Sequence, residues 1–298
     1  MELIFLGTSS MVPTKERAHQ AMFLTVKNNG ILIDCGEGTQ RQMKIAGINL
    51  VKIDKILISH WHGDHVLGLP GLLQTLSSTS NEYSKTMEIY GPPGLGKKFE
   101  MLKTALEFEL TFEVKIIEIK AGIIFENREY KIESALLDHS TPSYGFSIIE
   151  ADHRNIDLAK AKKLGLSPGI ELGKLQDGET IEFKGKKITP EDASETTKGK
   201  KLTIIPDTAL CKECIELADE ADILIAEATY ANDLSEKAEK YKHLTAGQAG
   251  LIANKANAKK LILTHFSQRY KNTQQIEEDA RNVFDNVTAA KDFMKTKI

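Results

Sequence analysis

Three histidines and one aspartate fall within six consecutive residues of this chain, at His60, His62, Asp64 and His65. They follow the apolar, β-branched run 55–58, which predicts a buried strand. The run after them carries Pro70 and predicts the start of a helix. We therefore expect the cluster on a loop at the carboxyl end of a strand, where α/β proteins place their chemistry.

Imidazole and carboxylate groups at this spacing suit zinc or a similar divalent metal ion. His60 and His62 are two positions apart on a tight loop and can converge on one ion, which leaves Asp64 and His65 for a second ion. A single tetrahedral site would leave one of the four groups unused. The alternative interpretation, a histidine-rich surface loop with incidental metal affinity, is disfavoured by the matching groups further along the chain.

The same pattern, an apolar strand that ends in a histidine or a carboxylate, recurs downstream at His139, Asp207 and His265. With Asp207 as a bridge, the seven groups make two sites. The first consists of His60, His62 and His139, and the second of Asp64, His65 and His265. Two ions roughly 3.5–4 Å apart lower the pKa of a water between them and supply a nucleophile near neutral pH. Asp64 can also accept a hydrogen bond from that water and aim it.

Three further groups lie outside this set. His243 precedes a predicted helix and could protonate a leaving oxygen, with Glu227 orienting it. It could equally be a surface histidine near a helix start, and the residues alone do not favour either interpretation. Asp34 ends a predicted strand and could cap the helix that starts near Thr39 or hydrogen-bond a metal ligand. The second role is slightly favoured, because the same strand-end edge carries the histidine cluster.

The composition is that of an ordinary soluble globular protein, with 298 residues, 41% hydrophobic and 27% charged. A formal net charge of −3 neither indicates nor excludes nucleic-acid binding, since a local basic patch is what matters. The N-terminal residues predict a first strand rather than a signal peptide, and no stretch reaches the roughly 20 apolar residues of a membrane span. We expect a cytoplasmic protein without a membrane partner.

The chain has three cysteines, and such a low, odd count indicates a reducing compartment without a disulfide framework. Cys211 and Cys214 form a CxxC pair, which could be a redox pair or half of a zinc site. No second CxxC exists to complete a zinc site, and the pair opens a predicted helix. On the sequence alone, packing or chance is the favoured interpretation.

Strands and helices alternate in both halves of the chain, which predicts two α/β halves packed sheet to sheet with the site along their shared strand ends. Asn29-Gly30 predicts a hairpin turn between strands near 21–27 and 31–34. Residues 151–178 lack the apolar periodicity of their flanks. They contain a short basic helix near 159–165, which could protrude or could be a solvated surface helix.

The spacing His60-x-His62-x-Asp64-His65, with His139, Asp207 and His265 on strand ends, resembles the metallo-β-lactamase superfamily. Within it, the chain resembles the ribonuclease Z family, endonucleases that mature tRNA 3′ ends. The narrower resemblance rests on motifs at 5–10 (FLGTSS), 33–40 (IDCGEGTQ), 206–208 (PDT), 226–229 (AEAT), 243–245 (HLT) and 264–270 (THFSQRY).

The resemblance implies an α/β fold, a four-layer αββα sandwich over 1–298, with two Zn²⁺ per subunit and a homodimer. It implies that 151–178 is an inserted flexible arm that grips tRNA, with RNA contacts from Lys160, Lys162 and Lys163. It also implies that Pro13-x-Lys15-x-Arg17 contacts substrate, although composition alone favours an ordinary solvated loop there. His243 becomes the proton donor, with Glu227 beside it.

The expected reaction is hydrolysis of one phosphodiester in precursor tRNA, 3′ of the discriminator base, with no DNA partner. One alternative is a general metal-dependent phosphodiesterase of the same fold. Another is a non-catalytic RNA-binding protein, which the intact set of ligands disfavours.

Overall fold

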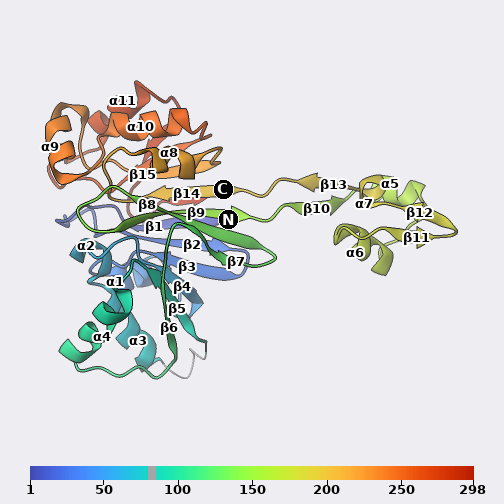
Figure 1. Ribbon diagram of the computed structural model, residues 1–298, viewed down its shortest axis with the longest axis horizontal. Helices are drawn as coiled ribbons and strands as arrows, with labels where there is room; N and C mark the ends of the chain where they lie inside the picture. Colours follow the sequence, from blue (N-terminus) through green and yellow to red (C-terminus); the bar gives the residue numbers. More distant parts are fainter. Residues whose placement is uncertain (80–84) are drawn as a thin grey trace. The chain divides into compact units, whose positions relative to one another are not determined.

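The computed structural model describes residues 1–79 and 85–298, which divide into two compact units. The larger unit comprises Met1–Ile149 and Lys201–Ile298, and the smaller one comprises Glu150–Lys200. Among the described residues, the larger unit has two seven-stranded sheets that face each other, with helices on both outer faces (Figure 1).

The first sheet has the strand order β18-β1-β2-β3-β4-β5-β6, in which β3 to β6 run parallel. Its strands are β1 (Glu2–Gly7), β2 (Ala21–Val26), β3 (Asn29–Ile33), β4 (Ile53–Leu57), β5 (Met87–Gly91), β6 (Val114–Glu118) and β18 (Lys295–Lys297). The helical segments of this half are α1 (Thr39–Ile45), the 3₁₀ turn η1 (Leu50–Lys52), α2 (Gly63–Val66), α3 (Leu69–Ser78) and α4 (Leu95–Ala105).

The second sheet has the order β17-β16-β15-β14-β9-β8-β7, in which β14 to β17 run parallel. Its strands are β7 (Gly122–Glu126), β8 (Tyr130–Leu137), β9 (Ser143–Glu150), β14 (Lys201–Ile205), β15 (Ile223–Glu227), β16 (Leu261–Thr264) and β17 (Val287–Ala289). The helical segments are α8 (Lys212–Ala218), η2 (Asn232–Leu234), α9 (Ser235–Tyr241), α10 (Ala246–Lys255) and α11 (Gln274–Arg281).

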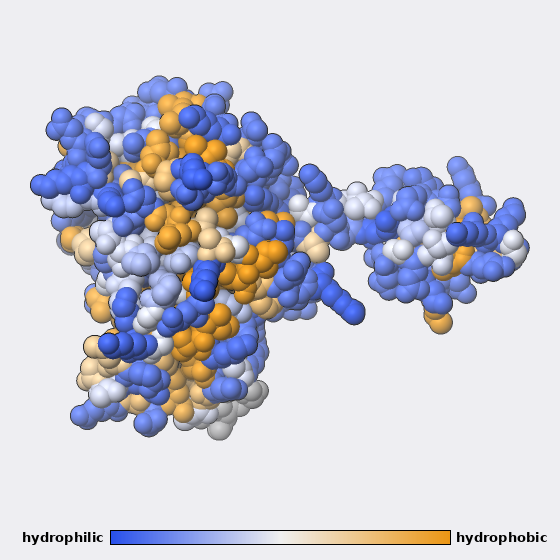
Figure 2. Space-filling model, in the orientation of Figure 1, coloured by the Kyte–Doolittle hydropathy of each residue, from blue (hydrophilic) through white to orange (hydrophobic). Residues whose placement is uncertain are grey.

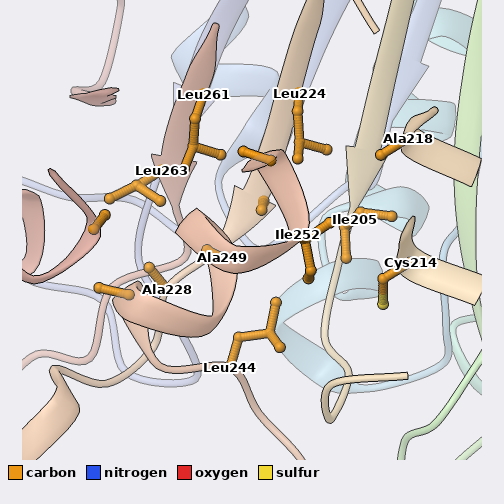
Figure 3. Packing of buried hydrophobic residues seen from close by; sticks show 14 of the residues in the cluster. Ile205, Cys214, Ala218, Leu224, Ala228, Leu244, Ala249, Ile252, Leu261 and Leu263 are labelled. Atoms are coloured by element: carbon orange, nitrogen blue, oxygen red, sulfur yellow. The ribbon is translucent and has the colours of Figure 1, made fainter. Parts of the chain in front are cut away.

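The apolar core of the larger unit has three layers. Between the sheets, fully buried side chains such as Phe5 from β1 and Phe146 from β9 pack in one cluster. A second cluster lies under α1, α3 and α4, and a third joins the second sheet to α8 and α10 (Figure 3). Burying one such large side chain contributes about 1.5–3 kcal/mol, so these layers fix the strand ends in place.

The predicted hairpin of β2 and β3 is confirmed, but its predicted turn is wrong. Val26 pairs with Asn29, so the two-residue turn is Lys27-Asn28, and Asn29-Gly30 already belongs to β3. Lys27 takes the positive φ of 53°. Gly30 is needed for close packing instead, because a Cβ there would lie 2.1 Å from the Lys52 carbonyl oxygen.

The smaller unit has its own architecture of two short antiparallel pairs and three short helices. Its elements are β10 (His153–Ile156), α5 (Leu158–Lys163), α6 (Ile170–Gln176), β11 (Ile181–Phe183), β12 (Lys186–Ile188), α7 (Pro190–Ala193) and β13 (Ser194–Thr197). β10 pairs with β13, and β11 pairs with β12. A separate small apolar cluster, which includes Leu172 and Leu175 of α6, holds these elements together.

The surface seen in Figure 2 is largely hydrophilic, with a band of apolar atoms on the larger unit. Within residues 1–79 and 85–298, no helix is long and apolar enough to cross a membrane.

Candidate metal centre

The seven expected ligands come from the carboxyl ends of strands in both sheets. In the second sheet, Asp207 follows β14 and His265 follows β16, and these strands flank β15 in parallel. In the first sheet, β4 ends at Leu57 and leads into the histidine cluster. Because carboxyl ends of parallel strands share one edge of a sheet, the fold brings groups 200 positions apart into contact.

The first group consists of His60, His62, His139 and Asp207, whose candidate ligand atoms all lie within 4.8 Å of one another. Nε2 of His60 lies 3.7 Å from Oδ2 of Asp207, and Nε2 of His139 lies 4.0 Å from the same oxygen. Nδ1 of His62 is 3.3 Å from Nε2 of His139.

The second group consists of Asp64, His65, Asp207 and His265, again within 4.8 Å. Oδ1 of Asp207 lies 3.4 Å from Nε2 of His65 and 3.2 Å from Nε2 of His265. The two imidazoles also approach Oδ2 of Asp64, at 3.5 and 3.3 Å. Asp207 therefore turns one oxygen to each group, which is the arrangement of a bridging carboxylate.

Several of these expected ligand atoms are buried without a hydrogen-bond partner. Among the described residues, Nε2 of His60, Oδ1 of Asp64 and Oδ1 of Asp207 accept or donate no hydrogen bond. Buried polar atoms are normally satisfied, and imidazole nitrogens with carboxylate oxygens are the donor set of zinc and related ions. The groups therefore fit a metal cofactor.

At His60 and Asp207, the surroundings favour the protonation state that binds metal. Burial, followed by the neighbouring His65, holds the pKa of His60 well below its usual range, so this imidazole is neutral. Burial alone would raise the pKa of Asp207, but His265, His65 and His60 outweigh it and keep the pKa well below the usual range. Asp207 is therefore an ionised carboxylate in spite of its burial.

Four of the five expected histidine ligands are oriented through their other ring nitrogen. Nδ1 of His65 lies 2.7 Å from Oδ2 of Asp34, and Nδ1 of His139 lies 2.9 Å from the Lys242 carbonyl oxygen. Asp34 does not cap α1, whose N-cap residue is Gly38. Of the two interpretations of Asp34, the structure contains the contact with His65, which is an expected metal ligand. Such contacts fix the tautomer and the ring plane of a ligand.

Two orienting residues were missing from the sequence analysis. The hydroxyl of Ser59 lies 3.0 Å from Nδ1 of His60, and the hydroxyl of Thr229 lies 3.0 Å from Nδ1 of His265. Ser59 directly precedes the histidine cluster, and Thr229 ends the motif at 226–229, so their positions beside these motifs could have indicated their roles. The Lys242 carbonyl had none, because a backbone oxygen carries no signature in the side-chain pattern.

Glu227, which is fully buried, and His243, which is partly buried, form a pair beside the first group. Nδ1 of His243 lies 3.0 and 3.1 Å from the two carboxylate oxygens of Glu227, and 3.9 Å from Oδ2 of Asp207. Glu227 also accepts hydrogen bonds from the Thr208 N–H at 2.8 Å and the Thr229 hydroxyl at 2.5 Å. Burial lowers the pKa of His243, but Glu227 outweighs burial and raises it to about 9. His243 is therefore charged at neutral pH and can donate a proton.

Glu227, His243 and His265 also lie close enough to hold an ion as a third group. We assign Glu227 to His243 instead, because both of its oxygens are already hydrogen-bonded.

The loop with Pro13, Lys15 and Arg17 contacts the segment that follows the second sheet's strand β16 through Arg17. The Arg17 guanidinium donates a hydrogen bond to the Tyr270 carbonyl and lies 5.8 Å from the centre of the Phe266 ring, next to His265. Pro13 and Lys15 are exposed. The loop is thus anchored beside the metal groups and presents its tip to solvent.

The arm lysines lie on α5 in the smaller unit. Lys162 and Lys163 are exposed, whereas Nζ of Lys160 lies 2.7 Å from Oε1 of Glu195. The unit carries ten basic and ten acidic residues and is neutral overall. Any RNA contact here would depend on local clusters of lysine rather than on net charge.

Comparisons with known proteins identify relatives of the whole chain. The chain is 39% identical to ribonuclease Z of Methanothermobacter thermautotrophicus, over 100% of this chain and 97% of that protein. The crystal structure of the human short-form tRNase Z has a TM-score of 0.74 and 30% identity, covering 100% of this chain and 99% of that one. A sequence family described as anti-Pycsar protein Apyc1 matches residues 1–159.

The metallo-β-lactamase fold protein YhfI from Bacillus subtilis has a TM-score of 0.72 at 18% identity, covering 99% of this chain and 98% of that chain. The expected α/β fold, an αββα sandwich of the metallo-β-lactamase type, is confirmed.

Proposed function

Because the chain belongs to the ribonuclease Z family, we propose that it is an endoribonuclease that removes the 3′ trailer of precursor tRNA. It hydrolyses one phosphodiester just 3′ of the discriminator base and leaves a 3′-hydroxyl on the tRNA and a 5′-phosphate on the trailer. The similarity to ribonuclease Z runs through both halves of the chain, whereas the Apyc1 match ends before Asp207, Glu227, His243 and His265.

The cofactor that we propose is a pair of zinc ions per subunit. His60, His62 and His139 would hold one, Asp64, His65 and His265 the other, with Asp207 shared. When bound, such a pair supplies Lewis acidity to the attacking water and to the scissile phosphate.

The chain's own residues then direct the water and the protons. Asp64 keeps its Oδ1 without a partner in the described residues and accepts a hydrogen bond from the water, which aims the water at phosphorus. His243 is held through Nδ1 by Glu227, so its Nε2–H is the proton that reaches the departing 3′ oxygen. The P–O3′ bond breaks as the new P–O bond forms in line.

The position of His243 supports this specific proposal over a metal hydrolase of unspecified substrate. His243 stands outside the two sets of expected ligands, is charged through Glu227, and its Nδ1 lies 3.9 Å from Oδ2 of the shared Asp207. A proton donor that is held in place beside the shared carboxylate suits a reaction with a poor leaving group, and a 3′-alkoxide is one.

We propose that the substrate is held by the Pro13–Arg17 loop and by lysines of the Glu150–Lys200 unit, which would serve as the tRNA-binding arm. Arg17 supports the first part, since it is anchored beside His265 through Phe266 and Tyr270. A homodimer, a cytoplasmic location and the absence of a DNA partner complete the proposal as predictions from the sequence.

The decisive experiment is cleavage of a precursor tRNA with a 3′ trailer, with and without a metal chelator, beside an unstructured RNA of equal length. We expect chelator-sensitive cutting at the discriminator base and none in the unstructured RNA. Hydrolysis of a small chromogenic diester without tRNA cleavage would instead support the general phosphodiesterase. Tight tRNA binding without cleavage, in a protein purified without metal, would support the non-catalytic RNA-binding protein.

A further inference from the structure

Two cysteines outside the metal groups lie in direct contact. The Sγ atoms of Cys211 and Cys214 are 3.3 Å apart. Cys211 is the half-buried N-cap residue of α8, and Cys214 is fully buried in the first turn of that helix. In Figure 3, Cys214 lies among Ile205, Ala218 and Ile252 of the apolar cluster. Neither thiol takes part in the proposed hydrolysis.

A metal site does not account for this pair. In the part of the chain that the structure describes, three groups of His, Cys, Asp and Glu could hold an ion, and none of them contains a cysteine. A structural zinc ion needs four such ligands. Two explanations of the cysteine pair therefore remain, which are thiol chemistry and packing alone.

The two thiols have different chemical characters. A hydrogen bond from the Cys214 thiol lowers the pKa of Cys211 to about 6, against the opposing effect of burial. The same contact and burial raise the pKa of Cys214 above its usual range. Cys211 is thus the thiolate that attacks an oxidant, and Cys214 is the protonated thiol behind it. Burial raises the pKa of the third cysteine, Cys35, to about 12, which leaves it unreactive.

The backbone leaves room for the bond. A disulfide has an S–S distance of about 2.05 Å, so the sulfurs must approach by roughly 1.2 Å. Cys211 precedes the helix in an extended conformation, with φ −135° and ψ 164°, so its position is not fixed by helical hydrogen bonds. Small rotations at Cys211 can supply the approach without moving the buried Cys214.

We propose that Cys211 and Cys214 are a redox site that forms a reversible intrachain disulfide on reaction with hydrogen peroxide. The Cys211 thiolate attacks one peroxide oxygen, the O–O bond breaks, and after one proton is taken up, water and a Cys211 sulfenic acid result. The Cys214 sulfur then attacks the Cys211 sulfur, the S–O bond breaks and a second water leaves. Two thiols lose two electrons and two protons, and one peroxide becomes two waters. A dithiol reductant reverses the bond by exchange.

The sequence provides a direct assay, because Lys212 lies between the two cysteines. Trypsin cuts there and separates peptide 202–212, with Cys211, from peptide 213–237, with Cys214. The full-length, metal-loaded protein is treated with peroxide and then denatured, which exposes Cys35 and Cys214. Its free thiols are alkylated, and it is digested without reductant. We expect the two peptides to run as one linked species that is two hydrogens lighter than their sum. Free thiols should fall from three to one and return to three with dithiothreitol.

The variants Cys211→Ser and Cys214→Ser should each remove the linked species, while alkylation of Cys35 stays the internal control. Because Cys214 is fully buried, Cys214→Ala is made as well, and circular dichroism checks that each variant is folded. Separate peptides from the oxidised wild type, with Cys211 carried on to sulfinic acid, would overturn the proposal. So would a linkage that appears only between two chains on a non-reducing gel.

Discussion

Nδ1 of His65 lies 2.7 Å from Oδ2 of Asp34, and both side chains are buried. The same carboxylate accepts hydrogen bonds from the Ser59 backbone N–H at 2.8 Å and from the Ser59 hydroxyl at 2.9 Å. Asp34 itself has a positive φ of 55°, which aspartate tolerates better than most residues. One carboxylate thus fixes a proposed metal ligand and the start of the loop that carries the others.

Asp34→Asn should weaken metal binding without removing a ligand. The amide cannot accept all three hydrogen bonds with the strength of a carboxylate, so the His65 ring loses its fixed plane. Loss of such a contact typically costs 10–100-fold in metal affinity, which competition with a chromogenic chelator measures. Asp54→Asn is the matched control, because Asp54 binds the Gly30 N–H and Lys85 far from the cluster. Equal effects of both variants would contradict the role given to Asp34.

Asp64→Ala should abolish tRNA cleavage and leave the fold intact. Asp64 is buried beside His265 and ends no secondary-structure element, so its loss removes a proposed ligand and the group that aims the water. We expect a fall on the order of 10²–10⁴-fold or more in single-turnover rate. Circular dichroism and the melting temperature of the chelated protein serve as controls. Cleavage near the wild-type rate would remove Asp64 from the mechanism.

Glu227→Gln should change the pH dependence of cleavage. The pKa of His243 is raised to about 9, so the protonated donor is present below that pH and is lost as the pH rises through it. Without the Glu227 charge, burial dominates and the pKa falls, which moves the alkaline limb of the rate profile to lower pH. Single-turnover rates from pH 6 to 10 test this. An unchanged alkaline limb would assign it to another group.

The same pair affects stability, with a sign that follows from the raised pKa. The contribution of charged His243 is fully present below its unfolded pKa, near 6.5, and disappears as the pH rises through about 9. The melting temperature of the wild type should therefore fall more than that of Glu227→Gln between pH 7 and 10. Parallel falls in both proteins would count against the coupling.

Removal of the smaller unit should separate RNA recognition from chemistry. The Glu150 N–H donates to the Lys200 carbonyl at 2.9 Å, so these residues can be joined by a short Gly-Ser linker in place of 151–199. We expect tRNA cleavage to fall at least tenfold while hydrolysis of a small diester stays within about twofold, since the proposed ligands are all retained. Equal losses on both substrates would make the unit structural.

A charge test on α5 refines that experiment. Lys162→Glu/Lys163→Glu reverses two exposed charges and should raise the KM for tRNA, more at low salt than at high salt. Lys160→Ala is the matched control, because its ammonium is already paired with Glu195. A double variant with the same KM and the same salt dependence as the wild type would exclude phosphate contacts by these lysines.

Sequence patterns predicted the positions of the ligands because strand ends are visible in a sequence. His139, Asp207 and His265 each follow an apolar run. Asp207 and His265 follow β14 and β16, which both pair in parallel with β15, so their ends share one edge, whereas β8, before His139, pairs antiparallel with β7. The partners of these groups were harder to predict. His139 contacts the backbone carbonyl oxygen of Lys242. The direction of this carbonyl depends on a left-handed φ of 53° at Lys242, a conformation that a lysine in the sequence does not indicate.

The extent of the smaller unit also exceeded what the sequence could show. The expected arm covered 151–178, whereas the compact unit continues to Lys200. Its base is formed by β10 and β13, which pair His153 with Thr197 across more than forty residues. Such short, polar strands have little periodicity, and only their long-range pairing defines them.

The shared carboxylate of Asp207 has a consequence for folding. Each proposed ion takes ligands from the loop after β4 and from the strand ends of the second sheet, so each would act as an intramolecular cross-link between two halves that are distant in sequence. Its binding free energy would then be added to the packing of one sheet on the other. A fragment containing only one sheet should bind metal weakly, and mixing two complementary fragments should restore metal binding and reassembly together.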